Sequence, residues 1–403
     1  MAGIVLSDRQ RLDWLRLIRS ESIGPRTFRS LMNRFGGASA ALDALPELGR
    51  QAGRHLKLCT VAEAEREFVA TQRLGARFIA LGEAGYPKAL QAIDSAPPLL
   101  TVLGAAAALL RPCVALVGSR NASAAGQKFT ARLARDLGEA GFVVVSGLAR
   151  GIDTAAHQAS LETGTVAVLA GGLDEIYPPQ NLALFDRLIA QGAGVTEMPL
   201  GWAPRGRDFP RRNRLVSGLS LGTVVVEAAR KSGSLITARF ANEQGRQVFA
   251  VPGSPLDPRA EGGNHLIREG ATLISEAAHV IEALGPLLND GMTPLDFAGV
   301  REESGEDPSD RLWDELELPG IAPAPEHAAL STGFDPVVPL VETRMAEDPS
   351  AVLLRLLGAA PISLDDLVRA SGLAARDVSR AVLELELSAA IQRHPGGLLS
   401  RAV

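Results

Sequence analysis

Hydrophobic residues along this chain follow two different spacings. From residue 113 to about residue 281, short apolar runs rich in β-branched residues alternate with segments whose apolar residues recur at helical spacing. Continuous apolar runs of this length suit strands that are buried on both faces of a parallel sheet. The runs are 113–117, 142–145, 165–169, 193–196, 223–226 and 248–251. With helices such as 124–140 and 155–163 as crossovers, the alternation predicts a doubly wound, Rossmann-like α/β domain.

The segments on either side of this domain show only the helical spacing. Residues 8–60 read as short helices, in which Gly24-Pro25 separates the first from the second and Gly36-Gly37 ends the second. This module resembles helix-hairpin-helix or SAM-like domains, and a role in packing or dimerisation fits it equally well. After Pro349, three helices (351–358, 363–370 and 376–387) and two short strands within 391–401 predict a winged helix.

The stretch between these two domains has a distinct composition. Residues 286–348 contain eight prolines, fifteen acidic residues and three basic ones, a local charge of −12. Because the whole chain carries −5, the remainder carries +7. We therefore predict an acidic, disordered linker, and the other domains together are mildly basic although the net charge of the chain is negative. We predict a helical module at 1–80, a Rossmann-like domain at 81–285, the linker at 286–348 and the winged helix at 349–403.

Other features of the sequence restrict the class of protein. Charged residues interrupt positions 1–17 where an export signal would need an apolar core, and the longest apolar stretch, 99–110, is too short to span a bilayer. The two cysteines, Cys59 and Cys113, form no CxxC pair. We therefore expect a cytoplasmic protein of 403 residues without a membrane segment, a metal or a cofactor.

The predicted strands end in small residues that suit an anionic ligand. In an open parallel sheet, ligands bind beyond the carboxyl ends of the strands, where glycines and helix N-termini admit phosphate. The candidate phosphate-binding residues at these ends are Gly118, Ser119, Arg120, Gly147, Arg150, Lys231, Ser232 and Ser234. Several such loops on one edge predict a surface for a polyanion.

The segment 205–214, Arg-Gly-Arg-Asp-Phe-Pro-Arg-Arg-Asn-Arg, carries five arginines, one aspartate and Phe209. Arginine binds phosphate with a planar fork of donors, and an aromatic ring can stack on an unpaired base. A solvated turn with Phe209 in the core is the alternative. Because the segment follows a strand that ends near Glu197, on the ligand-binding edge, we favour nucleic-acid contact.

Structural alternatives apply to several charged residues on the same edge. Arg120 could form a salt bridge, and Arg150 could pair with Asp153. Asp153 and His157 lie four residues apart on a helix and could suggest acid–base chemistry or half a metal site. Since no second His or Cys cluster supports a metal, we favour a capping aspartate and a packed histidine. We expect Glu197 and Glu227 to orient arginines or accept backbone N–H groups rather than to act as catalytic carboxylates.

Two common nucleotide-binding motifs are missing. The first strand–helix turn reads Gly-Ser-Arg-Asn-Ala-Ser-Ala-Ala-Gly rather than GxGxxG, and no GxxxxGK[ST] loop is present. A dinucleotide oxidoreductase and an ATPase are therefore disfavoured.

Taken in order, these blocks resemble the DNA-processing protein A family (DprA, also called Smf). The shared blocks include Tyr86-Pro87, 97–100, 117–120, 146–153 with His157, 172–174, 209–214, Glu227 with 232–234, 251–253 and 263–271. The resemblance covers most of the chain, including the helical module and the winged helix. Here the Tyr-Pro-x-x-Asn segment, 177–181, lacks the basic residue common in the family, so we expect the charge to concentrate in 205–214.

The resemblance implies a non-catalytic recombination mediator. Such proteins bind single-stranded DNA, form homodimers and load the recombinase RecA onto strands covered by single-strand-binding protein, which protects DNA during natural transformation. It also implies that Arg120 contacts phosphate, that Arg205 and Arg207 supply cationic contacts and that Phe209 lies against a base. Arg212, Asn213 and Arg214 complete that block.

Two other functions remain open at this stage. The first is a phosphoribohydrolase of the same broad fold, but its Pro-Gly-Gly-x-Gly-Thr-x-x-Glu block is absent, since Glu227 precedes the glycine here. The second is a transcription regulator acting through the winged helix. Arg376 and Arg380 alternate with Asp377 and Glu384 there, which favours protein contact or an accessory DNA contact over major-groove binding.

Overall fold

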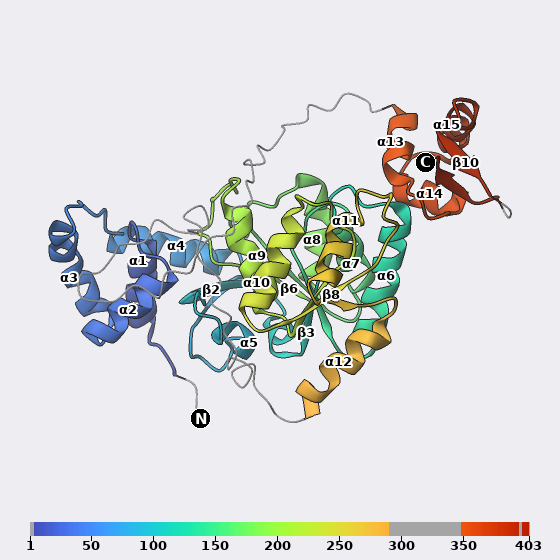
Figure 1. Ribbon diagram of the computed structural model, residues 1–403. Helices are drawn as coiled ribbons and strands as arrows, with labels where there is room; N and C mark the ends of the chain where they lie inside the picture. Colours follow the sequence, from blue (N-terminus) through green and yellow to red (C-terminus); the bar gives the residue numbers. More distant parts are fainter. Residues whose placement is uncertain (1–3, 290–347, 395–396, 403) are drawn as a thin grey trace.

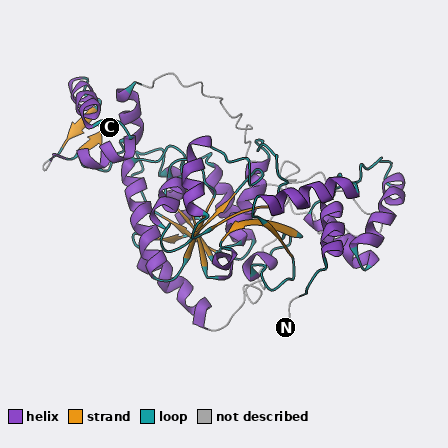
Figure 2. Cartoon of the chain, turned by 180° about the vertical axis from the view of Figure 1, so that it is seen from behind, coloured by secondary structure: helices purple, strands orange, loops and turns teal. Residues whose placement is uncertain are grey.

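A computed structural model describes residues 4–289, 348–394 and 397–402 (Figure 1). The predicted linker, 286–348, therefore lies almost entirely outside the described residues. The helical module and the winged helix lie at opposite ends of the sheet-containing domain (Figures 1 and 2). No helix in the described part of the chain combines the length and the apolar character needed to cross a membrane.

The N-terminal module consists of four helices: α1 (Asp8–Arg19), α2 (Pro25–Phe35), α3 (Ala38–Gln51) and α4 (Val61–Arg73). Its helix ends follow capping rules: Ser7 and Thr60 form capping boxes, and Gly36 ends α2 in the left-handed region at φ 73°. Helices α1 to α3 share one apolar core. The predicted helix breaks at Gly24-Pro25 and at Gly36 are therefore confirmed.

A nine-stranded sheet in the order β1-β2-β6-β5-β4-β3-β7-β8-β9 forms the central domain. Strands β3 to β9 are parallel, whereas β2 joins β6 and β1 joins β2 in antiparallel pairs. The strands are β1 (Arg77–Ala80), β2 (Leu99–Gly104), β3 (Cys113–Val117), β4 (Val143–Ser146), β5 (Thr165–Val168), β6 (Ala193–Thr196), β7 (Gly222–Val225), β8 (Gln247–Ala250) and β9 (Thr272–Leu273). The six predicted strands are confirmed, whereas β1, β2 and β9 had not been identified in the sequence.

Helices cover both faces of the sheet, as a doubly wound fold requires. They are α5 (Lys88–Gln91), α6 (Ala124–Glu139), α7 (Ile152–Ala159), α8 (Leu182–Leu188), α9 (Asp208–Gly218), α10 (Gly233–Glu243), α11 (Glu261–Arg268) and α12 (Ala277–Asn289). Successive residues of β3 point to opposite faces of the sheet: Ala115 and Val117 pack toward α9 and α10, while Val114 and Leu116 pack toward α6 and α7. The predicted Rossmann-like architecture is confirmed.

The C-terminal domain folds as the predicted winged helix. It contains α13 (Pro349–Leu356), α14 (Leu364–Ser371) and α15 (Ala375–Leu387), followed by the antiparallel pair β10 (Ile391–Arg393) and β11 (Leu399–Arg401). Ser363 caps α14, and Gly372 ends it in the left-handed region at φ 66°. The apolar core of this domain includes one residue from the central domain, Ala124 at the start of α6.

Candidate nucleic-acid interface

The predicted site loops gather at one edge of the sheet. The carboxyl ends of β3, β4, β5 and β7 lie side by side there because these strands are parallel and neighbouring strands pair along the sheet. The order of connection reverses between β3 and β7, which makes the gap between them the topological switch point of the fold. We call the loops 118–123, 146–151, 169–172 and 226–233 at these strand ends, together with the start of α9, the ligand edge.

Three side chains from different loops form a platform on the ligand edge. The guanidinium carbon of Arg120, after β3, lies 5.4 Å from the centre of the Phe209 ring at the start of α9. The ring of Tyr177 meets Phe209 edge-on at 5.6 Å, and Tyr177 is 41% exposed. This aromatic platform of Arg120, Tyr177 and Phe209 offers a π-face and a cation side by side, which suits an unpaired base and its phosphate.

A small pocket opens beside the aromatic platform. Its lining includes Tyr177 and Phe209 together with residues 169–171, which follow β5. Two charged residues, Glu175 and Arg212, also line it. The pocket therefore combines aromatic and charged residues.

Arg212 does not face solvent. Its Nη1 donates hydrogen bonds to the carbonyl oxygens of Gly147, after β4, and of Val168, at the end of β5, the latter at 2.7 Å. Burial lowers the pKa of Arg212 to about 10, although the nearby Asp153 carboxylate opposes this shift. In this conformation the Arg212 side chain fastens α9 to the sheet, and a DNA contact at Arg212 stays a prediction.

Gly147 has a structural reason to be glycine. A Cβ atom at this position would collide with the guanidinium of Arg212. At Gly118, a Cβ would meet the side chain of Ile152 at 2.6 Å. We had expected both glycines to admit phosphate, but the groups that approach them belong to the protein itself.

Arg214 is also buried, with 1% of its surface exposed. It forms an ion pair with Glu197, after β6, and donates a hydrogen bond to the carbonyl of Ser95. The backbone oxygen of Glu197 accepts a bond of 3.0 Å from Arg19 in α1. Arg214 therefore joins α9 to β6 and, through Glu197, to the helical module, rather than binding phosphate. The expectation that Glu197 orients an arginine is confirmed.

Glu227 occupies the N-terminus of α6, where mononucleotide-binding folds hold phosphate. Its carboxylate accepts hydrogen bonds from the backbone N–H of Ser123 at 2.8 Å and from the Ser123 hydroxyl at 2.5 Å. A Cβ at Gly126 would also collide with Glu227. The carboxylate thus takes the place of an anionic ligand. The expected structural role of Glu227 is confirmed, and Ser119, in the turn before α6, binds Asn121 and Ile152 through its own oxygens.

Asp153 and His157 also have structural roles. Asp153 accepts hydrogen bonds from the N–H groups of Gly147 and Ala149, and burial raises its pKa despite the opposing charge of Arg212. His157 is fully buried against Thr165, and burial, aided by Arg212, lowers its pKa to about 3. No cluster of three or more potential metal ligands occurs among the residues that the structure describes.

The remaining candidates are exposed cations and the N-terminus of α10. Arg205 and Arg207 are exposed, and the Arg205 guanidinium lies 4.9 Å from the centre of the Trp202 ring. Lys231 is exposed next to Ser232, whose hydroxyl caps α10 and contacts Ser234 at 2.7 Å. The amide of Asn213 donates to the carbonyl of Gly233 at 3.2 Å, which ties α9 to α10. Arg150 is exposed at the end of the β4 loop.

Two aromatic residues of the interface were missed as site residues. Tyr177 had been noted only within the resemblance to a family, and Trp202 had not been noted at all. Trp202 donates a hydrogen bond to Asp208 at 2.9 Å, so its indole is held beside the arginine segment. An aromatic residue three positions before Arg205 was the available signal. For Tyr177 there was none, because its contact with Phe209 depends on the fold.

Comparison with known proteins agrees with this geometry. Residues 77–285 match the family model of DNA recombination-mediator protein A, residues 8–70 match a DprA-like N-terminal HHH domain and residues 339–397 match a DprA winged helix domain. Protein Smf of Synechocystis is 34% identical over 97% of this chain and 98% of its own length. DNA processing protein DprA of Bacillus subtilis is 41% identical over 54% of this chain and 75% of its own length.

A solved structure shows the same fold. The X-ray structure of DNA processing protein A from Streptococcus pneumoniae superimposes with a TM-score of 0.58 and 30% identity. The match covers 69% of this chain and 98% of that chain. Since the family models match in order along the chain and a relative aligns over nearly its full length, this chain belongs to the DprA/Smf family of DNA recombination-mediator proteins.

Proposed function

We propose that this chain binds single-stranded DNA along the ligand edge and acts as a recombination mediator that loads RecA. The observation that carries the proposal is the aromatic platform, in which Arg120 comes from the loop after β3, Phe209 comes from the start of α9, and the guanidinium carbon lies 5.4 Å from the centre of the ring. A half-buried ring with an exposed aromatic neighbour and an exposed cation can offer a stacking surface to a base and hold the adjoining phosphate. Duplex DNA presents stacked bases whose faces are not accessible, so the platform favours single strands.

The electrostatics of the ligand edge support phosphate binding by side chains. Arg120 in the platform is exposed, as are Arg205, Arg207 and Lys231, and the N-terminus of α10 lies beside Asn213. The N-terminus of α6 is occupied by Glu227, which disfavours a nucleotide held there in the manner of dinucleotide-binding folds. Binding should therefore depend on arginine contacts and weaken as salt rises.

The engagement of both candidate carboxylates supports a non-catalytic role. Glu197 is paired with Arg214, and Glu227 accepts two hydrogen bonds from Ser123. Membership of the DprA/Smf family supports the further parts of the proposal: a homodimer in the cytoplasm that binds single-stranded DNA, RecA and single-strand-binding protein during natural transformation.

The first test is binding of labelled oligonucleotides by fluorescence anisotropy at two salt concentrations. We expect the wild-type protein to prefer single strands over a duplex of equal length. Phe209→Ala should lose about 1–3 kcal/mol of binding free energy per stacked base, and Arg120→Ala should lose a phosphate contact. Arg135→Ala, which removes one exposed charge from the C-terminal half of α6, is the matched control. Equal binding by the wild-type and both platform variants would refute this site.

The second test addresses RecA loading. We expect the wild-type protein to shorten the lag before RecA hydrolyses ATP on single strands coated with single-strand-binding protein. The Phe209→Ala variant should not shorten the lag, because it binds the single strand too weakly. A wild-type protein that binds single strands without shortening the lag would contradict the mediator role while leaving the DNA site intact.

A further inference from the structure

The winged helix contacts the central domain next to the ligand edge. Ala124, in the first turn of α6, belongs to the apolar core of the winged helix and is only 2% exposed. One turn further along α6, the ammonium of Lys128 lies 2.7 Å from a carboxylate oxygen of Asp366 in the first turn of α14. The start of α6, directly after the Arg120 loop, is therefore covered by the winged helix.

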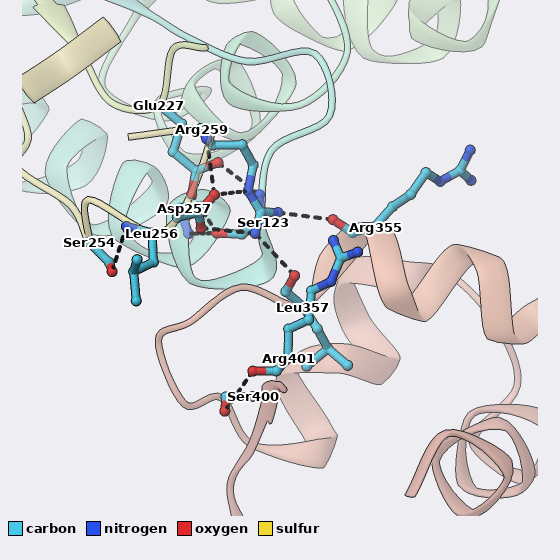
Figure 3. A network of polar contacts seen from close by, with 11 residues as sticks. Ser123, Glu227, Ser254, Leu256, Asp257, Arg259, Arg355, Leu357, Ser400 and Arg401 are labelled. Atoms are coloured by element: carbon cyan, nitrogen blue, oxygen red, sulfur yellow. Dashed lines mark hydrogen bonds and ion pairs between the residues drawn. The ribbon is translucent and has the colours of Figure 1, made fainter. Parts of the chain in front are cut away.

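Arg259 provides the second part of this contact (Figure 3). Its guanidinium binds both carboxylate oxygens of Asp257 at 3.0 Å and donates to the carbonyls of Arg355 and Leu357, also at 3.0 Å. These carbonyls lie at the C-terminus of α13, where backbone oxygens lack helical partners and a cation is favourable. Arg259 therefore holds the winged helix by the end of its first helix.

Gly358 allows this close approach from the winged-helix side. A Cβ at this position would meet Nη2 of Arg259 at 2.8 Å and Oδ2 of Asp257 at 3.1 Å. The guanidinium cannot move aside without losing hydrogen bonds, because Asp257 and the two carbonyls fix it. A methyl group at Gly358 should therefore weaken the contact without altering any residue of the central domain.

The same residues connect directly to the switch point. The carbonyl of Arg259 accepts a hydrogen bond of 2.7 Å from the N–H of Ala228, and Ala228 in turn accepts one of 2.8 Å from Gly262. Ala228 follows Glu227, whose carboxylate holds Ser123 at the start of α6 (Figure 3). The winged helix thus rests on both sides of the gap between β3 and β7.

We propose that this surface has two alternative occupants, the chain's own winged helix and a longer single strand of DNA, so that DNA binding releases the winged helix. The inference rests on the proposed function. A strand that leaves Arg120 along α6 meets Lys128, which Asp366 already neutralises. It also meets Asp365, which is exposed in the same turn of α14. Lys128 attracts phosphate, but in the docked state it is already paired with Asp366, which also pairs with Arg369 at 3.1 Å. The strand and the winged helix therefore compete for Lys128.

The contact is of a kind that DNA can displace. The Lys128 side chain is 68% exposed while that of Asp366 is 9% exposed, so salt reaches the lysine side of this ion pair and screens it in part. Among the described residues of α6, Ala124 is the member of the winged helix's apolar core. Released and docked molecules can therefore coexist at equilibrium, as a population shift requires.

The test measures docking and DNA binding on the same full-length protein. Donor and acceptor dyes are placed on Glu139→Cys in α6 and Arg376→Cys in α15, both exposed, in a Cys59→Ser background, since Cys113 is buried. We expect Gly358→Ala, alone or with Asp366→Lys, to lower the energy transfer. Gly285→Ala adds the same methyl group where nothing lies within 4 Å and should leave the transfer unchanged.

Adding single-stranded DNA should lower the energy transfer of the wild-type protein. An oligonucleotide of about 30 nucleotides should do so, whereas one of about 6, which occupies the platform alone, should not. The affinity gain of Gly358→Ala is set by the released fraction of the wild type: about 20% released predicts about fivefold tighter binding of the long strand. Unchanged transfer on saturation with the long strand, or release without an affinity gain, would overturn the proposal.

Failure of the proposed function gives a different result. If no oligonucleotide binds, the proposed DNA site is wrong. The effects of salt and of Gly358→Ala on the energy transfer still test whether the winged helix docks as described. If both oligonucleotides bind and Arg120→Ala abolishes binding, but neither winged-helix variant changes the energy transfer, then Arg259 and Lys128 do not hold the winged helix. That outcome refutes the competition and leaves the DNA site in place.

Discussion

The two halves of the arginine segment, residues 205–209 and 211–214, are both rich in arginine but have opposite roles. In the outer half, Arg205 and Arg207 are exposed and Phe209 forms the platform. In the inner half, Arg212 and Arg214 are 6% and 1% exposed and are bound to carbonyls and to Glu197. The difference arises because α9 begins at Asp208: Arg205 and Arg207 lie in the exposed loop before the helix, whereas Arg212 and Arg214 lie in the helix where it packs against the sheet.

The comparison shows that buried arginines hold α9 in place while exposed arginines stay free to change conformation. The buried arginines fix α9 against β4, β5 and β6, and this positions Phe209 for contact with Arg120 and Tyr177. The exposed arginines can then move to follow a DNA backbone. Changes in the inner half should therefore act on folding, and changes in the outer half on binding.

The largest effect is expected from Arg214→Met. The change removes the ion-pair partner of Glu197 and leaves its largely buried carboxylate with only the more distant charges of Arg19 and Arg211, which should cost about 3–5 kcal/mol in the free energy of unfolding. Urea denaturation measures this loss. Arg214→Met combined with Glu197→Gln should recover part of it. A loss below 1 kcal/mol for the single change would show that the ion pair is not a structural anchor.

A pH effect at His157 in α7, next to the buried Arg212, comes next. His157 has its pKa lowered to about 3 from 6.5, so the folded state holds it neutral while the unfolded state protonates it below 6.5. Stability should be complete above pH 6.5 and should fall between pH 6.5 and 3, by about 2–3 kcal/mol at pH 4.5 from this residue. His157→Gln should flatten that part of the curve. An unchanged curve would refute the assignment.

A smaller effect is expected from Tyr177 in the platform. Tyr177→Ala removes the edge contact with Phe209, and we expect single-strand affinity to fall by about 0.5–1.5 kcal/mol with little change in unfolding. Tyr177→Phe keeps the ring and should bind as the wild type does. Anisotropy with the same oligonucleotide distinguishes the two. Equal losses in both variants would assign the effect to the hydroxyl group instead.

The smallest effect should come from Arg205→Ala with Arg207→Ala. Both side chains are exposed, so the free energy of unfolding should change by less than about 0.5 kcal/mol. The slope of log affinity against log salt should become shallower by about 1.4, because two phosphate contacts are lost. A large drop in stability with an unchanged slope would reverse the assignment of the two halves.

The sequence alone determined the architecture and the general position of the site. Apolar runs that continue through both faces of a strand, such as 113–117, predict a buried parallel strand because only that environment removes every side chain from water. Glycine and proline at Gly24-Pro25 and Gly36 placed helix boundaries through local backbone preferences. The arginine segment marked the ligand edge, since the residues that follow parallel strands meet on one side of a sheet.

Only the tertiary structure decided which candidate side chains face solvent. Arg212 and Arg120 are both arginines beside a strand end, but one is enclosed by the carbonyls of Gly147 and Val168 while the other reaches Phe209. The glycines at 118 and 147 admit protein atoms rather than phosphate. These distinctions depend on contacts between residues far apart in the chain, and the local spacing of residue types does not predict such contacts. For the same reason, the sequence pattern did not predict that the winged helix contacts Arg259 and Lys128 of the central domain.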